Sequence, residues 1–211
     1  MHHEGADTHG ARNRDRMQQA APLPPGYPWR FQRTVTLDDG RMVLVRPILP
    51  SDAPGLGEAI NAADADTIRR RFLGGRPQVT PELLAHLTTV DYVTRFALVA
   101  IDPATGRGVA IARYESADQE AAEVAIAVSP AWRHAALASA LLRMLAEAAR
   151  ERGIREFTGS YFADNRPVAA LLRELGGAGQ VIAHGIAEFS VALAGHATAA
   201  DGSTQPTPGR T

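Results

Sequence analysis

A glutamate stands just before a possible anion-binding site in the segment EVAIAVSPAWRHAALASALL, which runs from Glu123 to Leu142. Its apolar residues first alternate, as in a strand, and then recur at helical spacing after the turn at Ser129-Pro130. A helix start leaves about four backbone N–H groups without partners and carries partial positive charge. The segment therefore predicts an anion cradle close to one carboxylate.

Two elements must position these groups. The strand places its larger apolar residues on one face and Glu123 with small residues on the other: Val124, Ile126 and Val128 against Glu123, Ala125 and Ala127. The helix buries one apolar stripe, made of Leu137, Leu141, Met144, Leu145 and Ala148. Packing of that stripe leaves the loop before the helix open to solvent.

The rest of the pattern predicts a mixed α/β (α+β) domain. A β-α-β crossover links the Glu123 strand to a strand at 156–162, and the earlier strands form mostly antiparallel hairpins. In the N-terminal half we further expect a hairpin across 38–40, a helix capped near Ser51 or Asp52, a helical stretch through Ile68 and Phe72, and a helix from Thr80 with Pro81 in its first position. Later in the chain we expect a turn at 102–106, a helix that ends at 176–177 and strand material at 180–192.

Composition limits the classes of function. The 211 residues, 45% of them hydrophobic, suffice for one domain with tails. A net charge of -1 gives no reason to expect nucleic acid or an anionic membrane as partner. The sequence contains no cysteine and no histidine pair with metal-ligand spacing, so we expect no disulfide and no metal. It also shows no signal peptide or membrane-spanning run, which favours the cytoplasm.

The two ends differ in composition from the centre. Residues 1–29 mix polar residues with the Pro-rich run APLPPGYP, and residues 195–211 are small and polar. Neither has sustained apolar periodicity, so we predict disordered tails around one domain at 30–194. All 22 basic residues are arginine, which, with the high alanine content, suggests a GC-rich bacterial gene. Codon bias is the favoured explanation for the absence of lysine; in either case, any acetylation of a lysine side chain must lie on another molecule.

The loop Arg133-His134-Ala135-Ala136-Leu137-Ala138 resembles the pyrophosphate loop of the GNAT N-acetyltransferases, Arg/Gln-x-x-Gly-x-Gly/Ala. The likeness also includes MVLVRPILPSDAPGL (42–56), RFALVAID, GVAIARYES and ADNRPVAALLRELG (163–176). Within that family, IRRRFLG, LTTVDY and AEVAIAV are most similar to the acetyltransferase domain of bacterial protein-lysine acetyltransferases.

The resemblance implies a GNAT-type sheet whose parallel strand pair splays apart to hold acetyl-CoA. The cofactor contacts that it implies are the backbone near Ile126, Ala127 and Val128, the loop from Arg133 through His134, Ala135, Ala136, Leu137 and Ala138 to Ser139, and Asn165. For Asn165, a role as helix cap before Pro167 is as good an explanation as a cofactor contact. The family acts as acetyl-CoA-dependent N-acetyltransferases on amine acceptors and often forms dimers, so a homodimer is compatible with it.

Glu123 is the candidate catalytic base. An acceptor amine with a pKa of ~10.4 must lose a proton before it attacks a thioester, and burial in the cleft would raise the pKa of the glutamate toward that task. Related enzymes often have a glutamate at this place. The alternative is an exposed strand carboxylate near an arginine. Arg69, Arg70 and Arg71 form a short basic run that is interpreted as a solvated helix face, with an anion contact as the less favoured alternative.

Three residues depart from the family pattern. Ala136 replaces the usual Gly, Ala135 replaces an Arg or Lys, and Leu172 stands where many members have a tyrosine acid. Tyr161 is nearby in sequence, but its direction cannot be inferred. These departures support a second hypothesis, a catalytically silent domain of the same fold that binds or senses a ligand. The acceptor amine cannot be deduced from the residues, because a protein lysine, an antibiotic amine, a polyamine or a small metabolite would each present an amine to the same cleft. The resemblance favours a protein lysine.

Overall fold

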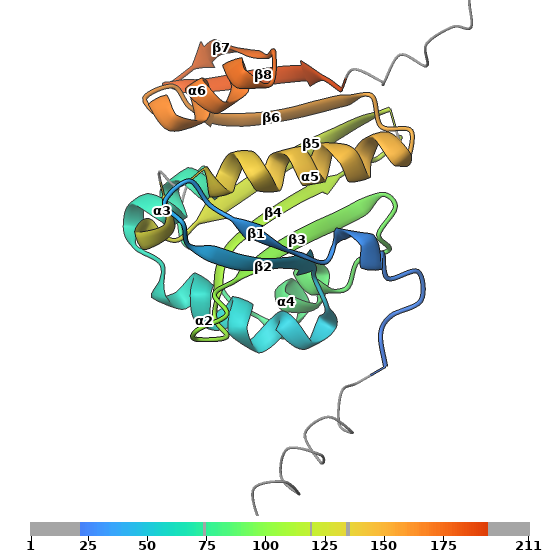
Figure 1. Cartoon of the computed structure of the whole chain (residues 1–211). Helices are drawn as coiled ribbons and strands as arrows, with labels where there is room; N and C mark the ends of the chain where they lie inside the picture. Colours follow the sequence, from blue (N-terminus) through green and yellow to red (C-terminus); the bar gives the residue numbers. More distant parts are fainter. Residues whose placement is uncertain (1–21, 74, 119, 134–135, 194–211) are drawn as a thin grey trace, which may run out of the picture.

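A computed structural model describes residues 22–73, 75–118, 120–133 and 136–193. Its strands form one eight-stranded mixed sheet in the order β1-β2-β3-β4-β5-β6-β8-β7, as Figure 1 shows. The strands are β1 (Arg33–Thr36), β2 (Met42–Pro47), β3 (Arg95–Ile101), β4 (Gly108–Glu115), β5 (Ala121–Val128), β6 (Glu156–Phe162), β7 (Ala178–Ala183) and β8 (Ile186–Ala192). Every neighbouring pair is antiparallel except β5 and β6. The mixed, mostly antiparallel sheet that the sequence predicts is confirmed.

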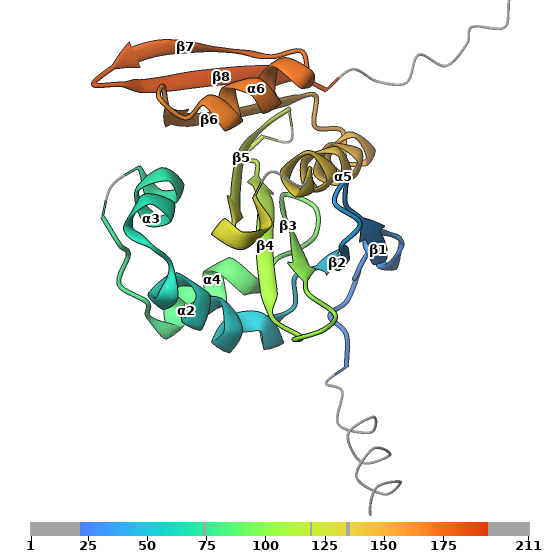
Figure 2. The same cartoon turned by 60° about the vertical axis from the view of Figure 1, so that its left-hand side comes forward.

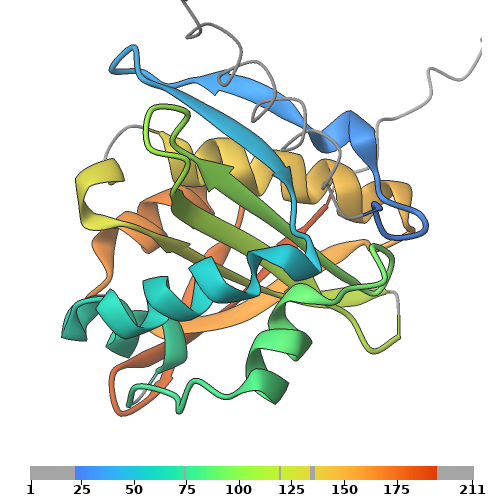
Figure 3. The same ribbon diagram turned by 90° about the horizontal axis from the view of Figure 1, so that it is seen from below.

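Helices cover both faces of this sheet. Figure 2 shows α5 on one side of β3 to β5, with α2, α3 and α4 on the other; Figure 3 shows the same layers from below. The helical elements are η1 (Trp29–Phe31), η2 (Pro50–Asp52), α2 (Ala53–Ala62), α3 (Ala65–Phe72), α4 (Pro81–Thr88), η3 (Pro130–Trp132), α5 (Leu137–Glu151) and α6 (Arg166–Glu174). Within the described residues, no helix is long and apolar enough to cross a membrane.

Local sequence signals explain where these elements begin. Thr80 caps α4 by accepting a hydrogen bond from the Leu83 N–H at 3.2 Å, and Pro81 occupies the first helical position. Asp64 caps α3 in the same way through the Thr67 N–H at 2.9 Å. The predicted turn at 38–40 joins β1 to β2, and the turn at 102–106 joins β3 to β4.

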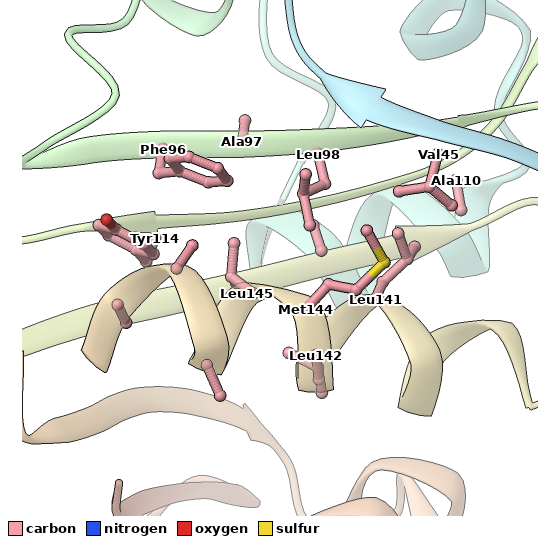
Figure 4. Close-up of a cluster of buried hydrophobic side chains, with 14 of the residues drawn as sticks. Val45, Phe96, Ala97, Leu98, Ala110, Tyr114, Leu141, Leu142, Met144 and Leu145 are labelled. Atoms are coloured by element: carbon pink, nitrogen blue, oxygen red, sulfur yellow. The ribbon is translucent and has the colours of Figure 1, made fainter. Parts of the chain in front are cut away.

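The main core lies between α5 and the sheet. Leu141, Met144 and Leu145 of α5 pack against Phe96 and Tyr114 of the sheet, while Ala97 points to the opposite face (Figure 4). Because residues directly opposite on neighbouring strands point to the same face, the register decides which side each β5 residue occupies.

Tyr114 pairs with Val124, so Val124 faces α5. Glu123 pairs with Glu115 and faces the other side, toward α2, α3 and α4. The two faces of β5 are thus as the alternation predicts.

The packed structure extends toward the N-terminus beyond the predicted boundary at residue 30. Tyr27 is 8% exposed, its ring packs edge-on against Trp29 and Tyr92, and its hydroxyl donates to Gln32 at 3.2 Å. Residues 1–21 and 194–211, which make up most of the two predicted tails, lie outside the described residues.

Candidate active site

The two parallel strands of the crossover separate at Glu123. Their register contains three pairs, Ala121 with Glu156, Ala122 with Phe157 and Glu123 with Thr158. Beyond these pairs β5 continues to Val128 and β6 to Phe162, but the strands no longer pair with each other. From residue 124 to 128, β5 stays paired with β4 on one edge, and its other edge faces an opening instead of β6. A splayed pair of this kind is what the family resemblance implies.

A cavity of about 140 Å³ lies at this opening. Glu123 and residues 124–126 of β5 form one wall, Arg70 and Arg71 of α3 border it, and leucines of α5 and α6 contribute apolar surface. One end of the cavity is therefore charged and the remainder is apolar. Such a shape can accept a long, mostly uncharged chain that carries a reactive polar end.

Glu123 lies at the charged end of the cavity. Its side chain is exposed and forms no hydrogen bond or ion pair within the described residues. The cross-strand Glu115, in contrast, lies 3.7 Å from His86 and 3.8 Å from Arg95. The expected burial of Glu123 is not found, because the cleft is open on the side that this residue faces.

The start of α5 has an unusual backbone. Ala136 precedes the helix with φ 57° and ψ 9°, in the left-handed region that favours glycine. Its carbonyl accepts from the Ala140 N–H at 2.9 Å, and no side chain caps the helix. A family glycine position is thus occupied here by a strained alanine, with the first N–H groups of α5 directly behind it. His134 and Ala135, also predicted to contact the cofactor, lie outside the described residues.

Arg133 is directed toward α3. Its Nη2 donates to Thr67 Oγ1 at 2.7 Å and lies 4.0 Å from Asp64, while its Nε donates to the Val128 carbonyl at 3.3 Å. The arginine of the loop therefore connects the end of β5 to the first turn of α3. To reach a bound pyrophosphate, it would have to give up the Thr67 contact.

The other predicted cofactor residues have mixed surroundings. Leu137 is buried, so its side chain belongs to the core and only its backbone is available. Ala138 is half-buried against that core, as are Ile126 and Val128, and Ala127 is half-buried too. Ser139 donates to Glu174 of α6 at 3.3 Å. That contact places a carboxylate near the helix start.

Asn165 is at the cavity wall. It occupies the N-cap position of α6, yet its side chain makes no capping hydrogen bond. Of its two proposed roles, capping thus lacks the interaction that would define it. Its side chain remains available for a ligand in the cavity.

Neither candidate for a general acid has a clear position for that role. Leu172 is 4% exposed and lines the cavity with apolar atoms. Tyr161 also lines it, but the ring is buried and packs against Phe189 with the centroids 6.2 Å apart. The cavity thus offers a hydroxyl at Tyr161, for which the described residues show no hydrogen-bond partner that would direct it.

Three arginines were not predicted as site residues: Arg70 and Arg71 border the cavity, and Arg113 lies next to it. Arg71 borders the cavity, contrary to its expected place on a solvated face. Burial lowers the pKa of Arg71, and the nearby Glu123 carboxylate partly raises it again. Arg113 of β4, directly opposite Ala125, is only 6% exposed. An arginine within the apolar strand GVAIARYE was the sequence signal that could have identified it.

The described residues contain no cluster of three or more His, Cys, Asp or Glu side chains arranged to hold a metal ion. The groups at this site are Glu123, the arginines, the backbone of β5 and the start of α5. These groups suit a long ligand with an anionic part near α5 and a reactive carbonyl near Glu123.

Comparisons with known proteins agree with this arrangement. Residues 68–176 match the acetyltransferase (GNAT) family. The chain is 34% identical over 148 residues to acetyltransferase PA5475 of Pseudomonas aeruginosa, an alignment that covers 69% of this chain and 80% of that protein.

Solved structures show the same fold. The GNAT domain of PAT from S. lividans is 28% identical, with a TM-score of 0.72, over 79% of this chain and 99% of that domain. A GNAT superfamily phosphinothricin acetyltransferase from Sinorhizobium meliloti, solved in complex with acetyl-CoA, is 22% identical with a TM-score of 0.56 over 79% of this chain and 94% of that protein. The chain belongs to the acetyltransferase (GNAT) family and is an acetyltransferase.

Proposed function

We propose that this protein transfers the acetyl group of acetyl-CoA to a primary amine, with Glu123 as the base. The observation that carries the proposal is the separation of β5 and β6 immediately after Glu123, with a cavity at that point. A thioester that entered between the strands would bring its carbonyl to the one carboxylate on the cavity wall.

The residues around the opening fit such a donor. The pantetheine arm carries amides, and the β5 backbone near Ile126, Ala127 and Val128, which pairs with β4 but not with β6, can hydrogen-bond to them along its β6 edge. The start of α5 behind Ala136 offers backbone N–H groups and dipole charge to a pyrophosphate. Ser139 and Asn165 supply further polar side chains at the two helix starts.

Acetyl-CoA, when bound, supplies a thioester whose C–S bond breaks as the acceptor nitrogen forms a bond to the carbonyl carbon. Glu123 accepts the proton that the amine loses, and coenzyme A leaves as its thiolate. The side chain is exposed in the open cleft, so the acceptor can reach it directly. Leu172 can donate no proton, so departure of the thiolate without enzymic protonation is the simplest account.

The acceptor is a primary amine. The sequence resemblance to protein-lysine acetyltransferases favours a lysine side chain. The shape of the site does not require one, because an amine of any size reaches an exposed carboxylate. Charges beside Glu123 are the property of this site that can distinguish acceptors.

Two measurements test the proposal. Calorimetric titration with acetyl-CoA and coenzyme A should give saturable binding, and Glu123→Gln should lower turnover by ~10²- to 10⁴-fold with little change in that binding. Glu188→Gln is the matched control, because Glu188 is an exposed strand glutamate of β8 outside the cavity. Full activity of Glu123→Gln between pH 6 and 9 would remove Glu123 from the role. No binding up to ~1 mM would instead favour the silent-module alternative.

A further inference from the structure

The three consecutive arginines of α3 have different surroundings. Arg69 is exposed and its guanidinium lies 3.7 Å from the ring centroid of Phe162. Arg70 pairs with Asp66 at 2.8 Å and lies 3.6 Å from Asp164. Arg71 forms no hydrogen bond or ion pair within the described residues, although it borders the cavity. A helix turns about 100° per residue, so only one of three neighbours can face β5.

Arg113 adds a second positive charge on the same side of the sheet. Its register partners are Ala97 and Ala125, and the residues on this face of β5 are Glu123 and Ala125. The small alanines leave room for the guanidinium between them. Its Nη2 atom is buried and has no hydrogen-bond partner within the part of the chain that the structure describes. Arg71 is close enough to Arg113 to lower its pKa, so the two charges lie near each other.

Arg113 is buried and Arg71 is half-buried, and neither forms a hydrogen bond or ion pair within the described residues, which is costly to the folded protein. Taking a charge out of water without pairing it is strongly unfavourable, and the mutual repulsion of like charges adds to this cost. An anion placed between Arg71 and Arg113 would remove both penalties. Glu123 borders the same cavity but lies beyond ion-pair distance, so it is available to an amine rather than bound to either arginine.

The charged end of the cavity thus consists of Glu123, Arg70 and Arg71, and Arg113 lies next to it, opposite Ala125. A molecule complementary to it carries an amine and an anion a short distance apart. A carboxylate suits the planar guanidinium groups, which donate two parallel hydrogen bonds to it. A lysine within a protein chain has no free carboxylate of its own to place beside these arginines.

We propose that Arg71 and Arg113 form an anion subsite beside Glu123, and that the acceptor is a small amino acid whose carboxylate they hold while its amine is acetylated. The inference rests on the proposed acetyl transfer and names its substrate class. Arg71 contacts the carboxylate at the cavity wall, and Arg113 contributes from behind it. Glu123 then takes the proton from the amine at the other end of the same molecule.

The test compares pairs of amines that differ only in a carboxylate: lysine with 1,5-diaminopentane, ornithine with 1,4-diaminobutane, and 4-aminobutyrate with propylamine. Acetylation of each, and of an end-blocked lysine peptide, is followed with acetyl-CoA as donor. The wild type should favour the carboxylate-bearing members by about tenfold or more in kcat/KM, as one charge-assisted hydrogen bond would give.

Variants separate the subsite from the rest of the site. Arg71→Gln and Arg113→Met should lower the preference in kcat/KM for each carboxylate-bearing amine over its carboxylate-free partner by about tenfold or more, whatever their effect on acetyl transfer in general. Arg69→Gln is the matched control, since it removes the same charge from the same helix outside the cavity. Calorimetric titration of each amine into the coenzyme A complex gives the same comparison without turnover.

The outcomes are distinct. Equal or faster acetylation of the carboxylate-free amines or of the blocked peptide would overturn the subsite while leaving acetyl transfer intact. Unchanged preference in both arginine variants would do the same. If no amine is acetylated and none binds the coenzyme A complex, the subsite is overturned as well. Failure to bind acetyl-CoA itself would contradict the proposed function rather than the subsite alone.

Discussion

Replacement of Arg113 by methionine should make the folded protein more stable. Burial, with the positive charges of Arg71 and Arg95, lowers the pKa of Arg113 from 12.5 to about 10, and Glu115 opposes this shift only in part. A difference of this size corresponds to about 3 kcal/mol against the charged form in the folded state. The side chain is 6% exposed, so solvent does little to screen that cost.

The expected gain in the free energy of unfolding is therefore about 1–3 kcal/mol, since methionine has a similar length and no charge to desolvate. The folded-state pKa lies below the unfolded value, so the cost is fully present below about pH 10 and falls only as the pH rises above it. Urea unfolding followed by circular dichroism should show the same gain at pH 6 and pH 8.

The control for this measurement is Arg107→Met, which changes an exposed arginine just before β4 and should alter stability by less than about 0.5 kcal/mol. A variant at Arg113 that is less stable than the wild type would refute the reasoning, because the guanidinium would then have partners that offset its burial. A gain in stability with a loss of activity toward amino acids would show that the charge is retained for the substrate.

Much of the fold follows from local signals. The helix starts at Asp64 and Thr80 depend on side chains within three residues of the cap, so the sequence alone identifies them. The alternation along β5 likewise predicts its two faces, because the period of two is a property of any strand. The crossover from β5 to β6 follows from the long helix between them.

The charged end of the site could not be predicted in the same way. The run from Arg69 to Arg71 has no internal feature that distinguishes a solvated arginine from a buried one. Only the packing of α3 beside β5 brings Arg71 to the cavity. Arg113 comes close to it because β4 pairs with β5 at a particular register, which is a long-range property. The exposure of Glu123 likewise depends on how far α3 stands from the strand, and not on any residue near 123.

Two further variants address the donor side of the site. Gly159→Ala should weaken coenzyme A binding and lower the free energy of unfolding by about 1–3 kcal/mol. The added Cβ would lie 2.8 Å from the Phe189 ring and 3.1 Å from the Val124 carbonyl, at the point where β5 and β6 separate. Unchanged affinity in calorimetry would mean that the pantetheine binds elsewhere. Ala136→Gly should strengthen coenzyme A binding. The left-handed backbone at φ 57° costs an L-residue about 1–2 kcal/mol, and glycine adopts it freely while opening the approach to the α5 N–H groups. Relief of this strain stabilises the folded state, but glycine also makes the unfolded chain more flexible, which offsets about 0.4–1 kcal/mol of the gain in stability. Thermal stability should therefore change little while the Kd for coenzyme A falls. Ala138→Gly is the control. It also removes a Cβ, but from a residue in the first turn of α5 whose backbone is not left-handed, so it should only destabilise the helix. If both variants lowered the Kd equally, added flexibility rather than relief of strain at Ala136 would be the cause.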